Sequence, residues 1–220
     1  MTIRDRVNYT GSLIRLFELT GQYEPKTREY VRELSRNADL VVNGGAFNGY
    51  WIDEALKVGA RHVEGFEPNH AKVKRLGERF HDNHRVTIFP FALTDKEGFV
   101  KFNQAVKAEL SSMVFSHSGT VTTVPCTTLD RMYFFDSVPI DLLILDAEGA
   151  EPSIIRGAYK LLISGRIKNM IIEYFPKAWT EKDWDFLRSF FKERIPIENE
   201  KPFWIISNPF HVTNWVLKNN

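Results

Sequence analysis

Short apolar runs alternate along this chain with segments of helical periodicity. Five such runs stand at 40–42, 62–66, 86–91, 140–145 and 170–172. Each is short enough to form one buried strand. Between them, apolar residues recur at intervals of three or four, as Val73, Leu76 and Phe80 do. Parallel strands need long crossover connections, which helices supply, so the pattern predicts an α/β fold with a mostly parallel sheet.

The residues before the first run show helical spacing of their own. Two helices are predicted, at 12–20 and at 26–36. They would either cap a site or pack on the sheet, and packing on the sheet is the simpler interpretation. We therefore divide the chain into a helical extension over 1–38 and a main domain over 39–220.

The later part of the chain contains signals for additional, shorter strands. Two are expected at 99–102 and at 121–125, with an irregular loop over 103–120. Near the end, 203–206 and 212–217 flank an Asn-Pro pair that is typical of a turn. A terminal hairpin is predicted there.

Composition narrows the classes of function. The chain has 220 residues, 29 basic and 28 acidic side chains and a net charge of +1, so a long polyanion is not the expected partner. No apolar run reaches the roughly 18–20 residues that cross a bilayer, and residues 1–15 lack a secretory signal. The single cysteine, Cys126, excludes an intrachain disulfide and favours a reducing, cytoplasmic setting.

Three glycines follow the first predicted strand, at positions 44, 45 and 49. Ligands of open α/β sheets bind at the carboxyl ends of the strands, and glycine lets the backbone approach them closely. An ordinary tight turn between strand and helix is the alternative. No Lys-Ser or Lys-Thr follows the glycines, which disfavours hydrolysis of a nucleoside triphosphate, and the spacing is not the nicotinamide type.

An acidic residue ends the second predicted strand. Glu67 lies 22 residues after Gly45, a spacing typical of the carboxylate that accepts the ribose hydroxyls of an adenosine. The alternative is a surface glutamate beside the helix cap at Asn69. The position at a strand end favours the ribose interpretation.

Three carboxylates follow the most hydrophobic strand, at Asp146, Glu148 and Glu151. Buried carboxylates are paired, hydrogen-bonded or used in chemistry. These are candidates to orient a substrate, to take its proton or to bind a metal. Glu173 follows the next strand and would complete a metal site with Asp146 and Glu148. Capping of the following helix is the alternative role for Glu151.

Taken in order, these motifs resemble the FkbM-type methyltransferases, a branch of the class I S-adenosylmethionine-dependent enzymes. The resemblance covers about 39–175 and depends on NGGAFNG (43–49), FEPN (66–69), ALTD (92–95), TLD (128–130), DAEGAE (146–151) and IE (172–173). It implies a Rossmann-like class I sheet, mostly parallel, with seven strands, a C-terminal antiparallel hairpin and helices on both faces. It also implies O-methylation of a small molecule or a sugar.

The resemblance implies two groups of site residues. The group expected to bind S-adenosylmethionine is Asn43, Gly45, Ala46, Gly49, Glu67, Pro68 and Ala92. Within it, Glu67 would hold the ribose, while Pro68 and Ala92 would flank the adenine. Asp146 and Glu148 would face the methyl group and the acceptor, with Asp146 the first candidate for the base. Whether a divalent metal takes part is left open.

Three positions differ from the family pattern. Asn43 stands where aspartate is usual, Phe47 where asparagine is usual, and Ile144 where lysine is frequent. A neutral residue at 43 weakens the hydrogen bond to the ammonium group of the cofactor, because charge assistance is lost. A binding protein that keeps the fold without catalysis is therefore an alternative hypothesis. A nucleic-acid 2′-O-methyltransferase and a nicotinamide-dependent oxidoreductase rank below it.

Overall fold

The computed structural model describes residues 24–105, 113, 119–174, 177–191, 193–197 and 213–218. The strands are β1 (Leu40–Gly44), β2 (His62–Phe66), β3 (Val86–Phe89), β4 (Ala92–Leu93), β5 (Gly98–Ala105), β6 (Gly119–Thr127), β7 (Leu142–Leu145), β8 (Asn169–Tyr174), β9 (Glu193–Ile197) and β10 (Thr213–Lys218). The helices are α3 (Pro25–Leu34), α4 (Tyr50–Lys57), α5 (His70–Phe80), α6 (Leu129–Tyr133), α7 (Glu151–Arg156), α8 (Tyr159–Ile163) and α9 (Glu181–Arg188). None of these helices is both long and apolar enough to cross a bilayer.

Seven of the strands form one sheet, in the order β3-β2-β1-β7-β8-β10-β9. Strand β10 runs antiparallel to both of its neighbours, whereas the pairs among β3, β2, β1, β7 and β8 are parallel. The predicted sheet is thus confirmed. The strand order reverses between β1 and β7, and such a reversal opens a crevice at the carboxyl ends of the two strands.

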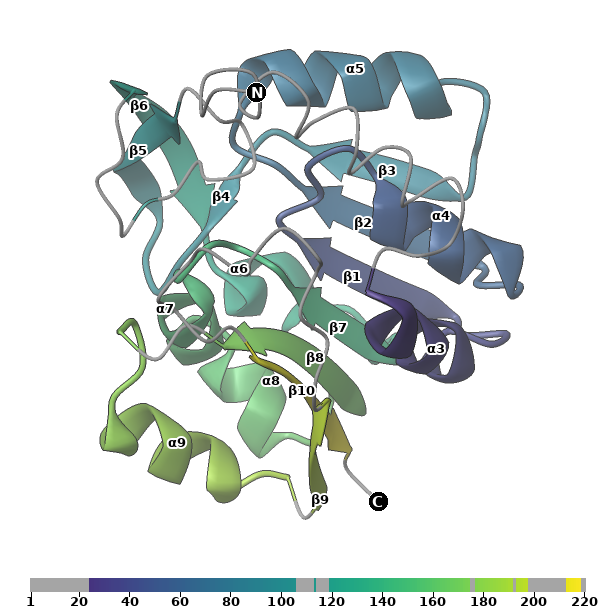
Figure 1. Ribbon diagram of the computed structural model, residues 1–220, viewed down its shortest axis with the longest axis vertical. Helices are drawn as coiled ribbons and strands as arrows, with labels where there is room; N and C mark the ends of the chain where they lie inside the picture. Colours follow the sequence, from purple (N-terminus) through teal and green to yellow (C-terminus); the bar gives the residue numbers. More distant parts are fainter. Residues whose placement is uncertain are drawn as a thin grey trace, which may run out of the picture.

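The strands alternate their side chains between two cores. Val41, Leu142 and Ile171 pack with α3, α4 and α5 on one face. Their neighbours Val42 and Leu143 pack with α6 to α9 on the other face. Figure 1 shows α3 and α4 at the right of the sheet and α7 to α9 at the left. A strand buried on both faces reads as a continuous apolar run, which is why the sequence pattern predicted these strands.

Part of the predicted N-terminal extension is described. The predicted helix over 12–20 lies outside the described residues, whereas the helix predicted at 26–36 is α3. Val31 of α3 is buried in the same cluster as the sheet residue Val41. Arg32 Nε donates a hydrogen bond to Glu54 of α4 at 2.5 Å. Helix α3 thus packs on the sheet through α4, and the boundary after residue 38 stays a prediction.

The predicted loop over 103–120 was too long. Strand β5 extends to Ala105 and strand β6 begins at Gly119, and together with β4 they form a separate three-stranded sheet. The two strands pair along their whole length, from Gly98 opposite Cys126 to Ala105 opposite Gly119. Hydrogen bonding to a partner strand keeps these residues in β-conformation, although their polar side chains alone would indicate a loop.

The terminal hairpin differs from its prediction in one strand. The predicted strand at 203–206 lies outside the described residues, and β10 pairs antiparallel with β8 on one side and with β9 on the other. Strand β9 contains Pro196, which lacks an amide donor, and it is tolerated because β9 is at the edge of the sheet. The helical segment after β7 is divided into α7 and α8 around Gly157, whose α-carbon lies against the Thr94 carbonyl group.

Candidate functional site

The loop between β1 and α4 is held in a shape that requires glycine. Gly45 and Gly49 have φ angles of 87° and 85°, in the left-handed region that glycine favours. A Cβ atom on Gly45 would lie 1.8 Å from the Asp146 carbonyl oxygen. The amides of Gly45 and Ala46 both donate to the Phe66 carbonyl oxygen, at 3.0 and 2.9 Å. These two residues therefore give the loop its shape and its close approach to Asp146, while their N–H groups are used within the fold.

Phe47 occupies an unusual backbone conformation for a bulky residue. Its φ angle is 48°, in the left-handed region where asparagine is several-fold enriched among non-glycine residues. The asparagine usual in the resembling family would adopt this conformation more readily. The Phe47 ring is half-buried, and Lys72 Nζ lies 3.8 Å from its centroid. A cation over an aromatic ring is an attractive contact that helps to hold Phe47 in place.

Glu67 ends β2 and faces this loop. It is 4% exposed, and its Oε2 and Oε1 atoms accept the backbone N–H groups of Phe47 and Asn69, at 2.9 and 2.8 Å. Burial raises the pKa of Glu67, while Lys72 and the two backbone hydrogen bonds act in the opposite direction. A carboxylate oxygen has two lone pairs, so each oxygen keeps one for a further donor. This geometry suits the two neighbouring hydroxyls of a ribose.

Asn43 ends β1 with an unsatisfied acceptor. The residue is 0% exposed, and its Oδ1 atom receives no hydrogen bond from the described part of the chain. Its amide nitrogen contacts the Gly44 carbonyl oxygen at 3.5 Å. A buried acceptor without a donor is unfavourable, so an incoming ammonium group would relieve it. Of the other predicted cofactor residues, Pro68 is half-buried, and Ala92 is buried beside Phe102 in the small second core. Their contact with adenine stays a prediction.

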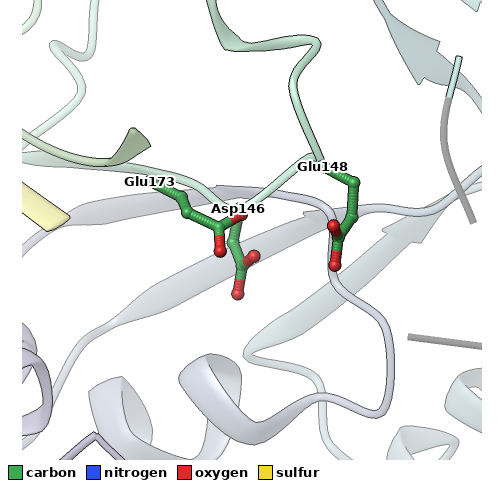
Figure 2. A group of neighbouring side chains, drawn as sticks. All are labelled: Asp146, Glu148 and Glu173. Atoms are coloured by element: carbon green, nitrogen blue, oxygen red, sulfur yellow. The ribbon is translucent and has the colours of Figure 1, made fainter. Parts of the chain in front are cut away.

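The predicted acidic residues come together at the carboxyl ends of β7 and β8. One carboxylate oxygen from each of Asp146, Glu148 and Glu173 lies within 4.8 Å of the other two. Figure 2 shows the three carboxylates gathered at this edge of the sheet. Asp146 and Glu148 follow β7, and Glu173 belongs to the neighbouring β8. Parallel pairing of the two strands therefore accounts for the cluster.

Burial and like charges raise the pKa values in this cluster. For Asp146 burial is the largest cause, and it outweighs hydrogen bonds from Trp51 and Glu173 and the charge of Lys72. For Glu173 burial comes first again, followed by the charges of Asp146 and Glu148, and its pKa is well above the usual range. Because the three carboxylates are close together and shielded from water, ionisation of all three at once is unfavourable. The site therefore attracts protons or a cation.

Two residues of the site were not among the predicted ones. The indole N–H of Trp51 donates a hydrogen bond to Asp146 Oδ2 at 3.1 Å. Lys72 of α5 lies over Phe47 and acts electrostatically on both Glu67 and Asp146. No local pattern marks either residue. Their roles arise because α4 and α5 pack beside the ends of β1, β2 and β7.

Glu151 supports the loop that carries the acidic residues. It begins α7, is 0% exposed, and its Oε1 atom accepts the backbone N–H groups of Ala147 and Gly149 at 2.7 and 3.3 Å. Its other oxygen, Oε2, is buried without a donor in the described residues. Burial is the largest cause that raises the pKa of Glu151, to about 8. Glu151 therefore stands at the start of the helix, as its alternative role required. Its side chain also holds the loop that joins Asp146 to Glu148.

Glu151→Gln is expected to stabilise the fold at alkaline pH. Because the folded pKa is about 8 and the usual value is 4.5, ionisation opposes folding increasingly as the pH rises between these values. A glutamine oxygen still accepts the two backbone N–H groups and carries no charge. Urea unfolding should show equal stability of the two proteins near pH 4.5 and a gain of a few kcal/mol for the variant above about pH 8. A variant that is less stable at about pH 9 would contradict the raised pKa.

Comparison with known proteins agrees with this arrangement. Residues 43–195 match the family described as "Methyltransferase FkbM domain". Among solved structures, an FkbM methyltransferase from Methylobacillus flagellatus is similar with a TM-score of 0.55 and 15% identity over 82% of this chain and 44% of that chain. This chain thus spans less than half the length of that relative. No curated protein matches the sequence significantly.

Two further structures share the fold. An rRNA methylase from Streptococcus thermophilus has a TM-score of 0.51 and 12% identity, over 88% of this chain and 94% of that one. The methyltransferase domain of METTL16 has a TM-score of 0.52 and 7% identity, over 89% and 81%. At these identities the likeness concerns the fold alone. The family match covers well over half of the chain, from the end of β1 into β9, so this protein belongs to the FkbM methyltransferase family, whose cofactor is S-adenosylmethionine.

Proposed function

We propose that this chain transfers a methyl group from S-adenosylmethionine to a hydroxyl oxygen of a small molecule or a sugar. One observation carries the proposal: the glycine loop expected to hold the cofactor lies directly against the acidic cluster. The α-carbon of Gly45 approaches the Asp146 carbonyl so closely that a Cβ would lie 1.8 Å from its oxygen. A methyl donor in the loop and an acceptor at the carboxylates would therefore be neighbours.

The residues of this site fit S-adenosylmethionine. The Glu67 oxygens would accept hydrogen bonds from the two ribose hydroxyls, through the lone pairs that the backbone N–H groups leave free. Asn43 Oδ1 is buried and has no donor among the described residues, so it would accept a hydrogen bond from the ammonium group. The loop at 45–49 would enclose the methionine part. When bound, the cofactor supplies an electrophilic methyl group on a sulfonium sulfur.

Asp146 is the proposed base, and Glu148 is the second candidate. A hydroxyl is a weak nucleophile near neutral pH, so a group that takes its proton assists the reaction. The Asp146 carboxylate would take the proton of the acceptor hydroxyl, whose oxygen would then receive the methyl group that the bound cofactor supplies. The Trp51 indole holds one Asp146 oxygen, which fixes the direction of the other. Burial raises the pKa of Asp146 above its usual value, which makes its carboxylate a stronger proton acceptor.

Binding of the cofactor is the experiment that tests this function. Calorimetric titration of S-adenosylmethionine and of its demethylated product should show one site in the native protein. Glu67→Gln should weaken binding roughly tenfold or more, because hydrogen bonds to a charged acceptor are lost. The matched control is Glu78→Gln, at an exposed position of α5, which should bind normally.

Two outcomes would contradict the assignment. Unchanged binding by Glu67→Gln would remove Glu67 from the ribose site, provided that thermal unfolding shows a folded variant. If the native protein did not bind S-adenosylmethionine, the better hypothesis would be a protein that keeps the methyltransferase fold without catalysis. The neutral Asn43 and the bulky Phe47 favour that second candidate, because both stand where the family usually places residues suited to the cofactor.

A further inference from the structure

We propose that Asp146, Glu148 and Glu173 form a binding site for a hard divalent cation. One oxygen from each carboxylate lies within 4.8 Å of the others. Figure 2 shows Asp146 and Glu173 side by side, with Glu148 beside them on the loop after β7. Carboxylate oxygens are the ligands that Ca²⁺, Mg²⁺ and Mn²⁺ prefer, and the described part of the site offers no thiol or imidazole.

The spacing of the oxygens sets the size of the cation. Two ligands of one ion lie no farther apart than twice the metal–oxygen distance, which is about 4.6–5.2 Å for Ca²⁺ and about 4.0–4.2 Å for Mg²⁺. Three oxygens around one ion must also share a centre, and at the 4.8 Å limit each would lie about 2.8 Å from it, slightly beyond the roughly 2.3–2.6 Å of Ca²⁺. At that limit, small side-chain movements would bring the oxygens to Ca²⁺. Mg²⁺, at about 2.0–2.1 Å, would need larger movements or bridging water.

A second observation points to a ligand at this place. Glu173 Oε2 is buried and receives no hydrogen bond from any residue that the structure describes. Its carboxylate is directed into the cluster, toward Asp146 (Figure 2). A buried carboxylate oxygen without a donor is strongly unfavourable. Two further carboxylates so close to this oxygen increase the electrostatic penalty, and a cation between the three groups would reduce it.

The surroundings already orient the proposed ligands. The Trp51 indole N–H donates a hydrogen bond to Asp146 Oδ2 and so restricts the orientation of this carboxylate. Glu151 fixes the backbone of the loop on either side of Glu148 through the amides of Ala147 and Gly149. Hydrogen bonds of this kind, from residues outside the ligand set, hold metal ligands in their working orientation.

A cation here would act on the acceptor. This role rests on the proposed methyl transfer, whereas the binding site itself does not. The cluster lies beside the glycine loop, so a cation held by it would meet a hydroxyl oxygen of the acceptor. Coordination lowers the pKa of a hydroxyl and fixes its position. The expected acceptor is therefore a molecule whose hydroxyl oxygen can coordinate the ion directly.

The test is calorimetric titration of CaCl₂, MgCl₂ and MnCl₂ into the whole chain without S-adenosylmethionine. We expect one saturable site for at least one of the three cations. Glu173→Gln and Glu148→Gln should each weaken binding roughly tenfold or more, since ligand charge sets the affinity. Thermal unfolding should show stabilisation by the cation in the native protein that is lost in Glu173→Gln. Glu78→Gln, remote from the cluster, should behave as the native protein does.

Each contrary outcome has a definite meaning. No saturable binding up to about 10 mM of any of the three salts would overturn the site and leave a cluster that holds only protons. Binding that survives both glutamine variants would place the cation elsewhere. The titration of S-adenosylmethionine is separate, so cofactor binding without cation binding would overturn this inference while the proposed function stands. Cation binding without cofactor binding would do the reverse.

Discussion

Gly45→Ala is expected to destabilise the fold by about 3 kcal/mol or more and to abolish binding of S-adenosylmethionine. The added methyl group would lie 1.8 Å from the Asp146 carbonyl oxygen, a distance at which the backbone must move. Gly45 also has a φ angle of 87°, which an alanine adopts only with strain. Because the loop contacts both β2 and the acidic segment, its displacement would disturb the cofactor pocket and the carboxylates together.

A matched control separates this effect from any general effect of alanine. Gly77 lies in α5, exposed to solvent, and a Cβ there meets nothing within 4 Å. Gly77→Ala should stabilise the protein by about 1 kcal/mol, because alanine is the better helix former. In urea unfolding, the midpoint of Gly45→Ala should therefore lie below that of the native chain, and the midpoint of Gly77→Ala above it. Equal midpoints for Gly45→Ala and the native chain would show that the loop does not contact Asp146 as described.

Asp146→Asn is expected to lower methyl transfer by a factor on the order of 100 or more while leaving cofactor binding largely intact. The amide cannot take a proton from the acceptor, and it is a poorer ligand for a cation. Its oxygen can still accept the Trp51 indole N–H, so the local geometry should be kept. Turnover measured with S-adenosylmethionine and candidate hydroxyl acceptors, beside the cofactor titration, would test both halves. A variant that retains full activity would remove Asp146 from the chemistry.

The same variant should gain stability as the pH rises. Burial raises the pKa of Asp146, so ionisation opposes folding above the usual value of 3.8 and increasingly so up to the folded pKa. Asparagine removes this penalty, and we expect equal stability at strongly acid pH and a more stable variant at alkaline pH. Asp82→Asn, at a side chain that is 86% exposed, is the control and should change stability by less than about 0.5 kcal/mol. Loss of activity with gain of stability is typical of residues kept for function.

Much of the fold followed from local patterns. Strands such as β7 were predictable because burial on both faces leaves only apolar residues, with Leu142 and Leu143 packing in opposite directions. The start of α9 was predictable because Thr180 and Asp183 satisfy each other's backbone groups in a capping box. These are interactions over a few residues, and the sequence states them directly.

The limits of prediction appear where contacts join distant segments. The break between α7 and α8 depends on Gly157 meeting Thr94 from another part of the chain. The extent of β5 depends on its pairing with β6. The partner of β10 was predicted as the residues just before it, whereas the structure pairs it with β9. A pattern within one segment carries no information about its neighbour in space.

For the site, the order of residues along the chain was enough to identify the groups at the strand ends: Glu67 after β2, Asp146 and Glu148 after β7, and Glu173 at β8. The carboxyl ends of parallel strands meet at one edge of a sheet, where ligands bind, so these groups were candidates from their positions alone. The interactions among them depend on the packing of the whole fold. It placed the three acidic oxygens within 4.8 Å, brought Trp51 to Asp146, and used Glu151 to hold the loop. Those relations depend on distance and burial, which arise only when helices and strands far apart in sequence pack together.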